Sequence, residues 1–126
     1  MENNLATSLT QFGIRTMNDH QKKQATRFNV NVIPINKSPR DVELKFFEPV
    51  YISIDLDGLD PAYAPGVSHP EPGGLSTRDI INFISNIQGE IVGADIVEYN
   101  PYKDINEITA ITAAKLLKEL MRKIIE

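Results

Sequence analysis

The sequence predicts an α/β protein built on a parallel sheet. Apolar segments rich in β-branched residues lie at 29–35, 50–56 and 90–100, and each has the length and composition of a strand. Segments that begin at 76 and 105 show helical periodicity instead. Strands that are separated by helices form parallel sheets, because the helices serve as crossovers. The chain is expected to form one such sheet.

Composition describes an ordinary globular protein. Of the 126 residues 41% are hydrophobic and 24% are charged, the net charge is -4, and cysteine is absent. The acidic balance argues against nucleic acid or an anionic membrane as the main partner, and the lack of cysteine excludes disulfides and thiolate metal sites. No stretch approaches the ~18 apolar residues of a membrane helix. The opening MENNLATSLT lacks the features of a signal peptide, so a cytoplasmic location is expected.

The first part of the chain predicts a strand, an exposed helix and a second strand. SLTQFGIR at 8–15 fits a short strand, and the polar segment 17–28 fits a helix that Asn18 or Asp19 would cap. NVNVIPI at 29–35 alternates as a strand does, and a proline so near its end should terminate it or place it at a sheet edge.

The middle of the chain predicts a strand, a long loop and a helix. Residues 36–49 could be a loop or contain a helical turn, whereas VYISIDL at 50–56 is a clear strand. Residues 57–75 are rich in glycine and proline and too long for a simple connection. A helix should begin after Ser76, with Asp79 in its first turn. Its expected apolar stripe is Ile80, Phe83, Ile84 and Ile87.

The last part predicts a strand at 90–100 and a final helix over 105–126. Lysine and arginine gather late in this helix, where they favour the helix dipole. Its expected apolar stripe is Ile108, Ile111, Leu116, Met121 and Ile125.

Carboxylates gather where the strand at 50–56 ends, within SIDLDGLDPAYAPG. Ligands of parallel α/β proteins bind at the carboxyl ends of strands. A strand period of two would place Asp55 and Asp57 on one face, and Glu98 lies near the equivalent end of the next strand. Glu98 is either a structural group at the strand end or a carboxylate that faces a cationic substrate. A turn is the alternative, since Asp57-Gly58 and Asp60-Pro61 favour chain reversal. It accounts well for Asp60 but poorly for Asp55, because a partly buried carboxylate needs a cation or several donors. Magnesium or manganese would supply that charge.

Four other polar or flexible positions carry weaker signals. His69 lies in the loop, where a histidine is more often exposed than catalytic, and His20 lies in a polar helix and receives no role. Glu71 is interpreted as a loop carboxylate, with substrate contact as the weaker alternative. Gly73-Gly74 is not a phosphate loop, because no lysine follows at the required spacing.

These residues resemble a known family. SIDLDGLDPAYAPGVSHPEPGGLS is similar to the final signature of the ureohydrolases, the arginase and agmatinase family, and GADIVEYNP resembles their following strand. QFGIRT resembles a strand of agmatinases, so the sequence favours agmatinase over arginase. The resemblance covers residues 9–126 and implies a binuclear Mn²⁺ hydrolase that releases urea from a guanidinium compound.

The resemblance also implies roles for individual residues. Asp55 matches the carboxylate that bridges both metal ions, and Asp57 matches a ligand of one ion. Glu98 matches the carboxylate that pairs with the guanidinium group. His69 falls where the family has a threonine or histidine that lines the site. Two dications would neutralise the neighbouring carboxylates.

The chain departs from the family in its upstream motifs. The Gly-Gly-Asp-His and Asp-Ala-His-x-Asp segments and the catalytic histidine of ureohydrolases are absent from this sequence. The expected fold is therefore the C-terminal portion of a three-layer, parallel-sheet ureohydrolase domain. Residues 1–126 would form a single incomplete domain with a flexible start at 1–8. The binuclear centre is not expected to assemble in this chain alone, and self-association or a missing N-terminal half is the expected partner.

Three functions remain open on the sequence. The chain can belong to an agmatinase-like hydrolase that another portion completes. It can instead be a truncated, non-catalytic remnant or a partner-binding chain. A nucleotide-sugar enzyme that uses Asp-x-Asp with a metal is a third reading, and the Pro-Gly and Gly-Gly-Leu context argues against it.

Overall fold

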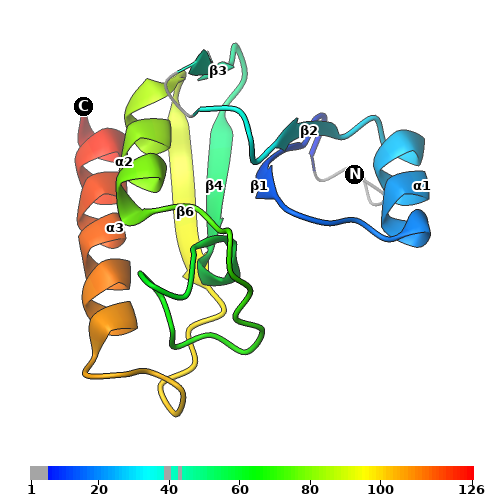
Figure 1. The fold of residues 1–126 in the computed structure, drawn as a ribbon. Coiled ribbons are helices and arrows are strands. Elements are labelled where there is room, and N and C mark those ends of the chain that lie inside the picture. Colours follow the sequence, from blue (N-terminus) through cyan, green and yellow to red (C-terminus); the bar gives the residue numbers. More distant parts are fainter. Residues whose placement is uncertain (1–5, 39–40, 43) are drawn as a thin grey trace. The chain divides into compact units, whose positions relative to one another are not determined.

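The computed structural model describes residues 6–38, 41–42 and 44–126. The chain divides into two compact units, Met1–Lys37 and Ser38–Glu126, and Figure 1 shows the elements of each. Most of the predicted flexible start at 1–8 lies outside the described residues. The single incomplete domain over 1–126 stays a prediction. In the part of the chain that is described, no helix combines the length and apolar character needed to cross a membrane.

The first unit is a strand–helix–strand motif. Strand β1 (Thr10–Ile14) pairs in parallel with β2 (Asn31–Pro34), and helix α1 (Asp19–Arg27) connects them. The predicted cap is Asn18, whose side chain accepts a hydrogen bond from the Gln21 backbone at 2.8 Å, while Gln21 returns one to the Asn18 backbone. The predictions for this segment are confirmed, including the proline that ends the second strand.

The second unit contains a parallel strand pair with two helices. Its elements are β3 (Leu44–Lys45), β4 (Val50–Asp55), α2 (Thr77–Asn86), β5 (Ile87–Gln88), β6 (Ile91–Val97) and α3 (Ile108–Ile125). Strand β4 pairs in parallel with β6, and the short strands β3 and β5 pair in parallel with each other. Helix α3 packs on both α2 and β6, as Figure 1 shows. The predicted strand at 50–56 and the helix after Ser76 are confirmed.

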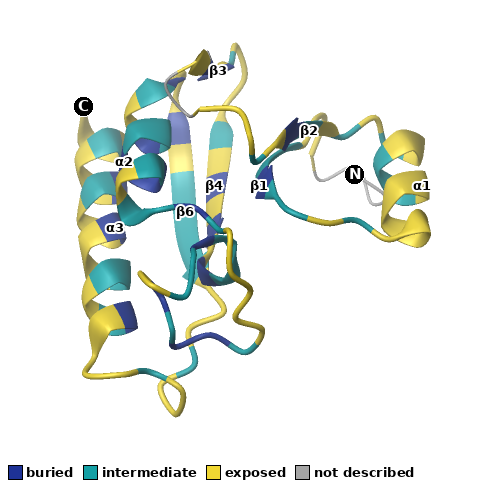
Figure 2. Ribbon diagram, viewed as in Figure 1, coloured by how far each residue is buried: buried dark blue, intermediate teal, exposed yellow. Residues whose placement is uncertain are grey.

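The core of this unit lies between the helices and one face of the β4–β6 sheet. Ile52 and Ile54 of β4 are buried, whereas the alternating residues Tyr51, Ser53 and Asp55 are exposed. This alternation separates a packed face of the strand from an open one. Helix α2 begins as predicted with a Ser76–Asp79 capping box. It buries Ile80, Ile81 and Ile84. Figure 2 shows the buried positions on the strands and on α2.

The apolar stripe predicted for the last helix is wrong at most of its positions. Of the five expected residues only Leu116 is buried, and Ile111, Met121 and Ile125 are 65%, 58% and 84% exposed. The buried positions of α3 are Thr109, Leu116 and Leu120. The predicted positions are spaced by three, five, five and four residues, so they drift around the helix instead of following one face.

Asp104 caps the start of α3 from outside the helix. Its Oδ1 accepts hydrogen bonds from the Ile105 and Thr109 backbones at 2.9 Å, and its Oδ2 accepts one from the Ala110 backbone at 3.0 Å. The buried Thr109 hydroxyl accepts a hydrogen bond from the Gly66 backbone at 2.7 Å. A Cβ at Gly66 would lie 2.8 Å from the Asp104 Cβ. The glycine therefore allows the long loop to approach the helix start.

Replacing Asp104 with asparagine is expected to make stability less dependent on pH. Burial raises the pKa of the Asp104 carboxyl, but the hydrogen bonds from the backbone N–H groups lower it by more. The net pKa therefore lies below the ordinary 3.8. A carboxyl whose pKa is lowered in the folded state stabilises the protein at pH values above its unfolded-state pKa. This stabilisation is lost as the pH falls through the folded-state pKa. Melting temperatures by circular dichroism should therefore be higher for wild type than for Asp104→Asn at about pH 7, and the difference should shrink as the pH falls through the folded-state pKa of Asp104.

The matched control is Glu90→Gln, at an exposed carboxyl of the same unit. Its melting temperature should follow wild type across the pH range. A constant difference between wild type and Asp104→Asn at every pH would contradict the role assigned to the charge of this cap.

Candidate functional site

The carboxyl ends of β4 and β6 lie side by side. In the parallel ladder Asp55 is the partner of Val97, and Glu98 follows directly. Neighbouring strands lie about 4.8 Å apart in a sheet, so the predicted placement of Asp55 and Glu98 at the ends of adjacent parallel strands is confirmed. Both residues are exposed, so the expectation that Asp55 is partly buried is wrong. They lie at the end of the sheet where parallel α/β proteins bind ligands.

Asp55 and Asp57 are arranged by a turn and not by a continuing strand. Strand β4 ends at Asp55, and a 3₁₀ turn follows over Leu56–Gly58. Asp55 caps this turn, because its Oδ1 accepts a hydrogen bond from the Asp57 backbone at 2.8 Å. The argument from a strand period of two is therefore wrong for Asp57, since the extended conformation does not reach it. The turn nevertheless keeps both carboxylates at the end of β4.

His69 lies beside Asp57. Its Nδ1 is 3.8 Å from the Asp57 Oδ2, and the side chains of His69 and Asp57 are 88% and 22% exposed. The loop that carries His69 is held at the end of β6, since the Lys103 ammonium donates to the Ser68 carbonyl at 2.8 Å and the Asn100 backbone donates to the Gly66 carbonyl at 2.8 Å. The structure therefore brings His69 to the Asp57 carboxylate.

Glu98 has a backbone conformation that is unusual for its residue type. Its φ of 66° lies in the left-handed region, which costs a side-chain-bearing residue roughly 1–2 kcal/mol. Val67 forms an isolated antiparallel bridge with Tyr99, so the chain is held immediately after this position. Backbone outliers of this kind gather at functional sites, and this supports Glu98 as a candidate site residue.

Asp60 organises the loop, as predicted, instead of facing the strand ends. Its Oδ1 accepts a hydrogen bond from the Ala62 backbone at 2.9 Å, and its Oδ2 accepts one from the Gly73 backbone at 2.7 Å. Gly73 has a φ of 84°, a conformation that glycine adopts without strain. Glu71, which precedes Gly73 by two residues in the sequence, is exposed.

A polar cluster on the open face of the sheet was not predicted. The Ser53 hydroxyl donates to Asp95 Oδ1 at 2.6 Å, and the Tyr51 hydroxyl donates to Asp95 Oδ2 at 3.1 Å. The hydrogen bond to Asp95, followed by burial, raises the pKa of the Tyr51 hydroxyl. The alternation of Tyr51, Ser53 and Asp55 along one strand could have shown this polar face, whereas the pairing with Asp95 required the register of two strands.

The donor set only partly fits a metal centre. Carboxylate oxygens are the ligands that manganese and magnesium prefer, and Asp55 and Asp57 supply them at one strand end. A two-metal centre needs several ligands for each ion. Within residues 6–38, 41–42 and 44–126, no three histidine, aspartate or glutamate side chains are close enough together to hold an ion. The described residues therefore hold no complete metal site, and Asp55 and Asp57 stay predicted ligands.

The fold and the site define a class: an α/β protein with carboxylates at the ends of adjacent parallel strands. A model of the Arginase family matches residues 1–122. The chain therefore belongs to the arginase, or ureohydrolase, family.

Plant arginases are among the similar proteins. Arginase 1 of Arabidopsis thaliana is 48% identical over 132 residues, which is 98% of this chain and 39% of that protein. The solved arginase of Medicago truncatula superposes with a TM-score of 0.89 at 46% identity, over 98% of this chain and 42% of that one. A mutant of the Trypanosoma brucei arginase-like protein, solved with Mn²⁺, gives 0.92 at 31% identity, over 99% of this chain and 45% of that one.

The length of the matches identifies the chain as a fragment of the fold. It spans about two fifths of the curated arginases that it matches, which bears out the expectation of a partial arginase-like fold. The mitochondrial agmatinase of Gallus gallus is 49% identical over 74 residues, which is 58% of this chain. The plant arginases named above match more of the chain than this agmatinase does, so the preference for agmatinase is not supported.

The prediction of a cytoplasmic location is contradicted by these relatives. The similar arginases of Arabidopsis, rice and Medicago are named mitochondrial, and a second Arabidopsis arginase is named chloroplastic or mitochondrial. The prediction depended on the first ten residues of a chain that matches only part of its relatives. Such residues do not test for a targeting segment.

Proposed function

We propose that this chain supplies one part of a manganese-dependent ureohydrolase centre, which hydrolyses a guanidinium C–N bond and releases urea. One observation carries the proposal: Asp55 and Glu98 end adjacent parallel strands in a chain of the arginase family. Asp55 and Asp57 would hold manganese. When bound, a metal pair lowers the pKa of a water molecule and supplies the attacking hydroxide.

Glu98 and His69 are proposed to face the substrate. A guanidinium group is planar and pairs with a carboxylate through two parallel hydrogen bonds, which Glu98 can accept at the exposed end of β6. His69 lies at the rim of the same strand ends, next to Asp57. A largely exposed imidazole there can contact a substrate that enters from solvent.

Arginine is the first candidate substrate and agmatine the second. The arginase relatives match 98% of the chain, whereas the chicken and fission-yeast agmatinases match 58% and 61%. Agmatine remains a candidate because the identity to the chicken agmatinase reaches 49% within the matched region. Both substrates carry the guanidinium group that Glu98 would bind.

A chimaera tests the proposal. The portion of the Medicago truncatula arginase that has no counterpart in this chain is joined to this chain in one polypeptide, and urea release is measured with manganese and either arginine or agmatine. The chimaera is expected to release urea. Asp55→Asn and Glu98→Gln should each lower the rate at least about 100-fold, which is the scale of losing one electrostatic group from an active site.

Glu90→Gln is the matched control, because Glu90 is an exposed carboxylate just before β6, at the other end of that strand. It should retain the rate of the parent chimaera. A chimaera that folds and binds manganese but releases no urea would favour the alternative, in which the chain is a non-catalytic remnant.

A further inference from the structure

The long loop between β4 and α2 is tied to α3 and to the turn that precedes this helix. The Thr112 hydroxyl donates to the Tyr63 carbonyl at 3.0 Å. The Gly66 backbone donates to the Thr109 hydroxyl at 2.7 Å. Two further hydrogen bonds reach the Gly66 and Ser68 carbonyls from the turn at 100–103. These bonds follow the loop in order, so its backbone is held as far as Ser68.

The last of these bonds comes from Lys103. Its ammonium donates to the Ser68 carbonyl at 2.8 Å, and a charged donor makes a stronger hydrogen bond than a neutral one. The lysine extends from a fixed turn, because its own backbone N–H donates to the Asn100 carbonyl at 3.1 Å. The Tyr102 backbone N–H donates to the Asn100 side chain at 3.1 Å. Lys103 is therefore placed to hold the residue directly before His69.

The side chain of His69 does not fix its own position. The imidazole is 88% exposed, and its Nδ1 lies 3.8 Å from the Asp57 Oδ2, beyond the roughly 3.2 Å of an N–H···O hydrogen bond. Neither burial nor this contact is enough to hold the ring. Its place beside Asp57 therefore depends on the backbone that Lys103 secures at Ser68.

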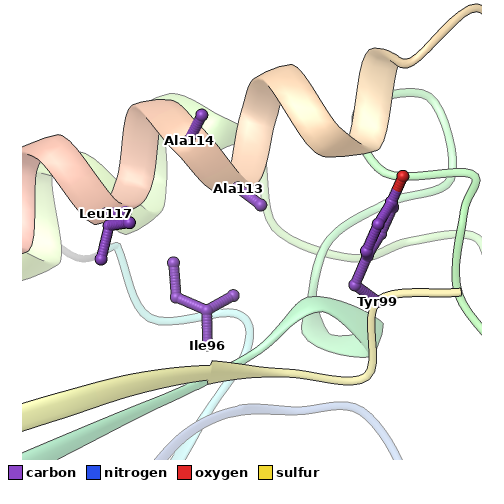
Figure 3. Close-up of a pocket in the computed structure, with 5 residues that line it drawn as sticks. All are labelled: Ile96, Tyr99, Ala113, Ala114 and Leu117. Carbon is purple, nitrogen blue, oxygen red and sulfur yellow. The ribbon is translucent and has the colours of Figure 1, made fainter. Parts of the chain in front are cut away.

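The segment that carries Lys103 also carries Glu98. Tyr99 follows Glu98 directly, and its hydroxyl donates to the Asp104 Oδ2 at 3.3 Å. Figure 3 shows the Tyr99 ring rising from the end of β6 toward the start of α3. One short, well-anchored segment therefore bears Glu98 and, through Lys103, holds the loop at His69.

We propose that Lys103 is a positioning residue, which keeps His69 beside Asp57 by binding the carbonyl of the preceding residue. The contact of His69 with a substrate rests on the proposed function, whereas the placement of the loop does not. Loss of the ammonium would release the loop at His69. The loop would stay fixed at Gly66, because Thr109 holds that residue independently.

Backbone amide relaxation, measured by NMR on the full chain, tests the placement. In wild type the order parameters of Gly66 and His69 should both be near the value of about 0.85 for rigid backbone. Lys103→Met removes the donor, and should lower the order parameter of His69 below about 0.6 while that of Gly66 stays unchanged. Lys103→Arg keeps a charged donor and should behave as wild type. Lys118→Met, at an exposed lysine of α3, is the matched control and should change neither value.

Steady-state kinetics of the chimaera test the contact with substrate. Lys103→Met should raise KM about tenfold, the lower end of the cost of losing a supporting hydrogen bond behind a site residue, and should leave kcat nearly unchanged. A purely structural defect would instead lower the amount of active enzyme, and with it kcat, at an unchanged KM. His69→Ala should also raise KM. Adding Lys103→Met to His69→Ala should raise KM no further, because Lys103 acts through His69.

Each outcome decides the proposal. Circular dichroism establishes that the variants fold, and Lys103→Ala replaces Lys103→Met if the latter does not. An order parameter of His69 that is low in wild type, or equal in wild type and Lys103→Met, overturns the proposal. Independent effects of Lys103→Met and His69→Ala on KM also overturn it. A chimaera that releases no urea counts against the proposed function alone, since the relaxation measurement still decides whether Lys103 places the loop.

Discussion

The purified chain by itself is expected to release no urea from arginine or agmatine at an enzymatic rate, even with excess manganese. Asp55 and Asp57 supply carboxylate oxygens from a single turn, whereas each ion of a two-metal centre needs several ligands in a fixed arrangement. An ion held by so few ligands stays largely hydrated and lowers the pKa of its water less than an enclosed pair does. Glu98 could still attract a guanidinium group, but attraction does not produce the nucleophile.

The measurement is urea production by wild type beside Asp55→Asn, with both substrates. The expected result is the same background rate for both proteins, far below the roughly one turnover per second at which ordinary enzymes begin. Turnover of about one per second or more that disappears in Asp55→Asn would refute the expectation. It would mean that a second copy or other residues of the chain complete the centre.

Truncation of Leu116 to alanine is expected to have the largest effect on stability. Leu116 is 0% exposed on the face of α3 that packs on the rest of its unit. Removing a buried leucine typically costs about 2–5 kcal/mol, through lost burial and the cavity left behind. This is a large share of the roughly 5–15 kcal/mol that stabilises an ordinary domain, so the second unit of Leu116→Ala should be partly unfolded at modest temperature.

Leu117→Ala is the matched control, because it is the same substitution one position further along, at a side chain that is 50% exposed. Its expected cost is below about 1 kcal/mol. The measurement is equilibrium denaturation in guanidinium chloride, followed by circular dichroism. Equal costs for the two variants would contradict the assignment of α3 faces.

Strands and helix starts were predictable because their signals are local. Apolar segments rich in β-branched residues marked β2, β4 and β6, and the capping residues Asn18 and Ser76 marked the starts of α1 and α2 within a residue. The position of the two candidate carboxylates was predictable for a similar reason, since Asp55 ends one recognisable strand and Glu98 follows another. Only their placement on neighbouring strands depended on the parallel topology, and that topology follows from strands joined by a helix.

The remaining features depend on contacts between distant residues. Strands β3 and β5 contain two residues each, which is too short for any periodicity. The cap of α3 is Asp104, which lies four residues before the helix. Apolar side chains also occupy exposed positions of α3, such as Ile111 and Met121, so spacing alone could not select the buried stripe. The partnership of Tyr51 and Ser53 with Asp95 likewise needs the strand register.

The exposed isoleucine and methionine side chains of α3, such as Ile111 and Met121, have a consequence for the chain in a living cell. Chaperones and proteases recognise exposed apolar side chains of this kind. Chain in which these side chains stay uncovered would be bound or degraded, whereas chain in which they are covered would persist. The amount of the protein in the cell would then depend on how quickly they become covered.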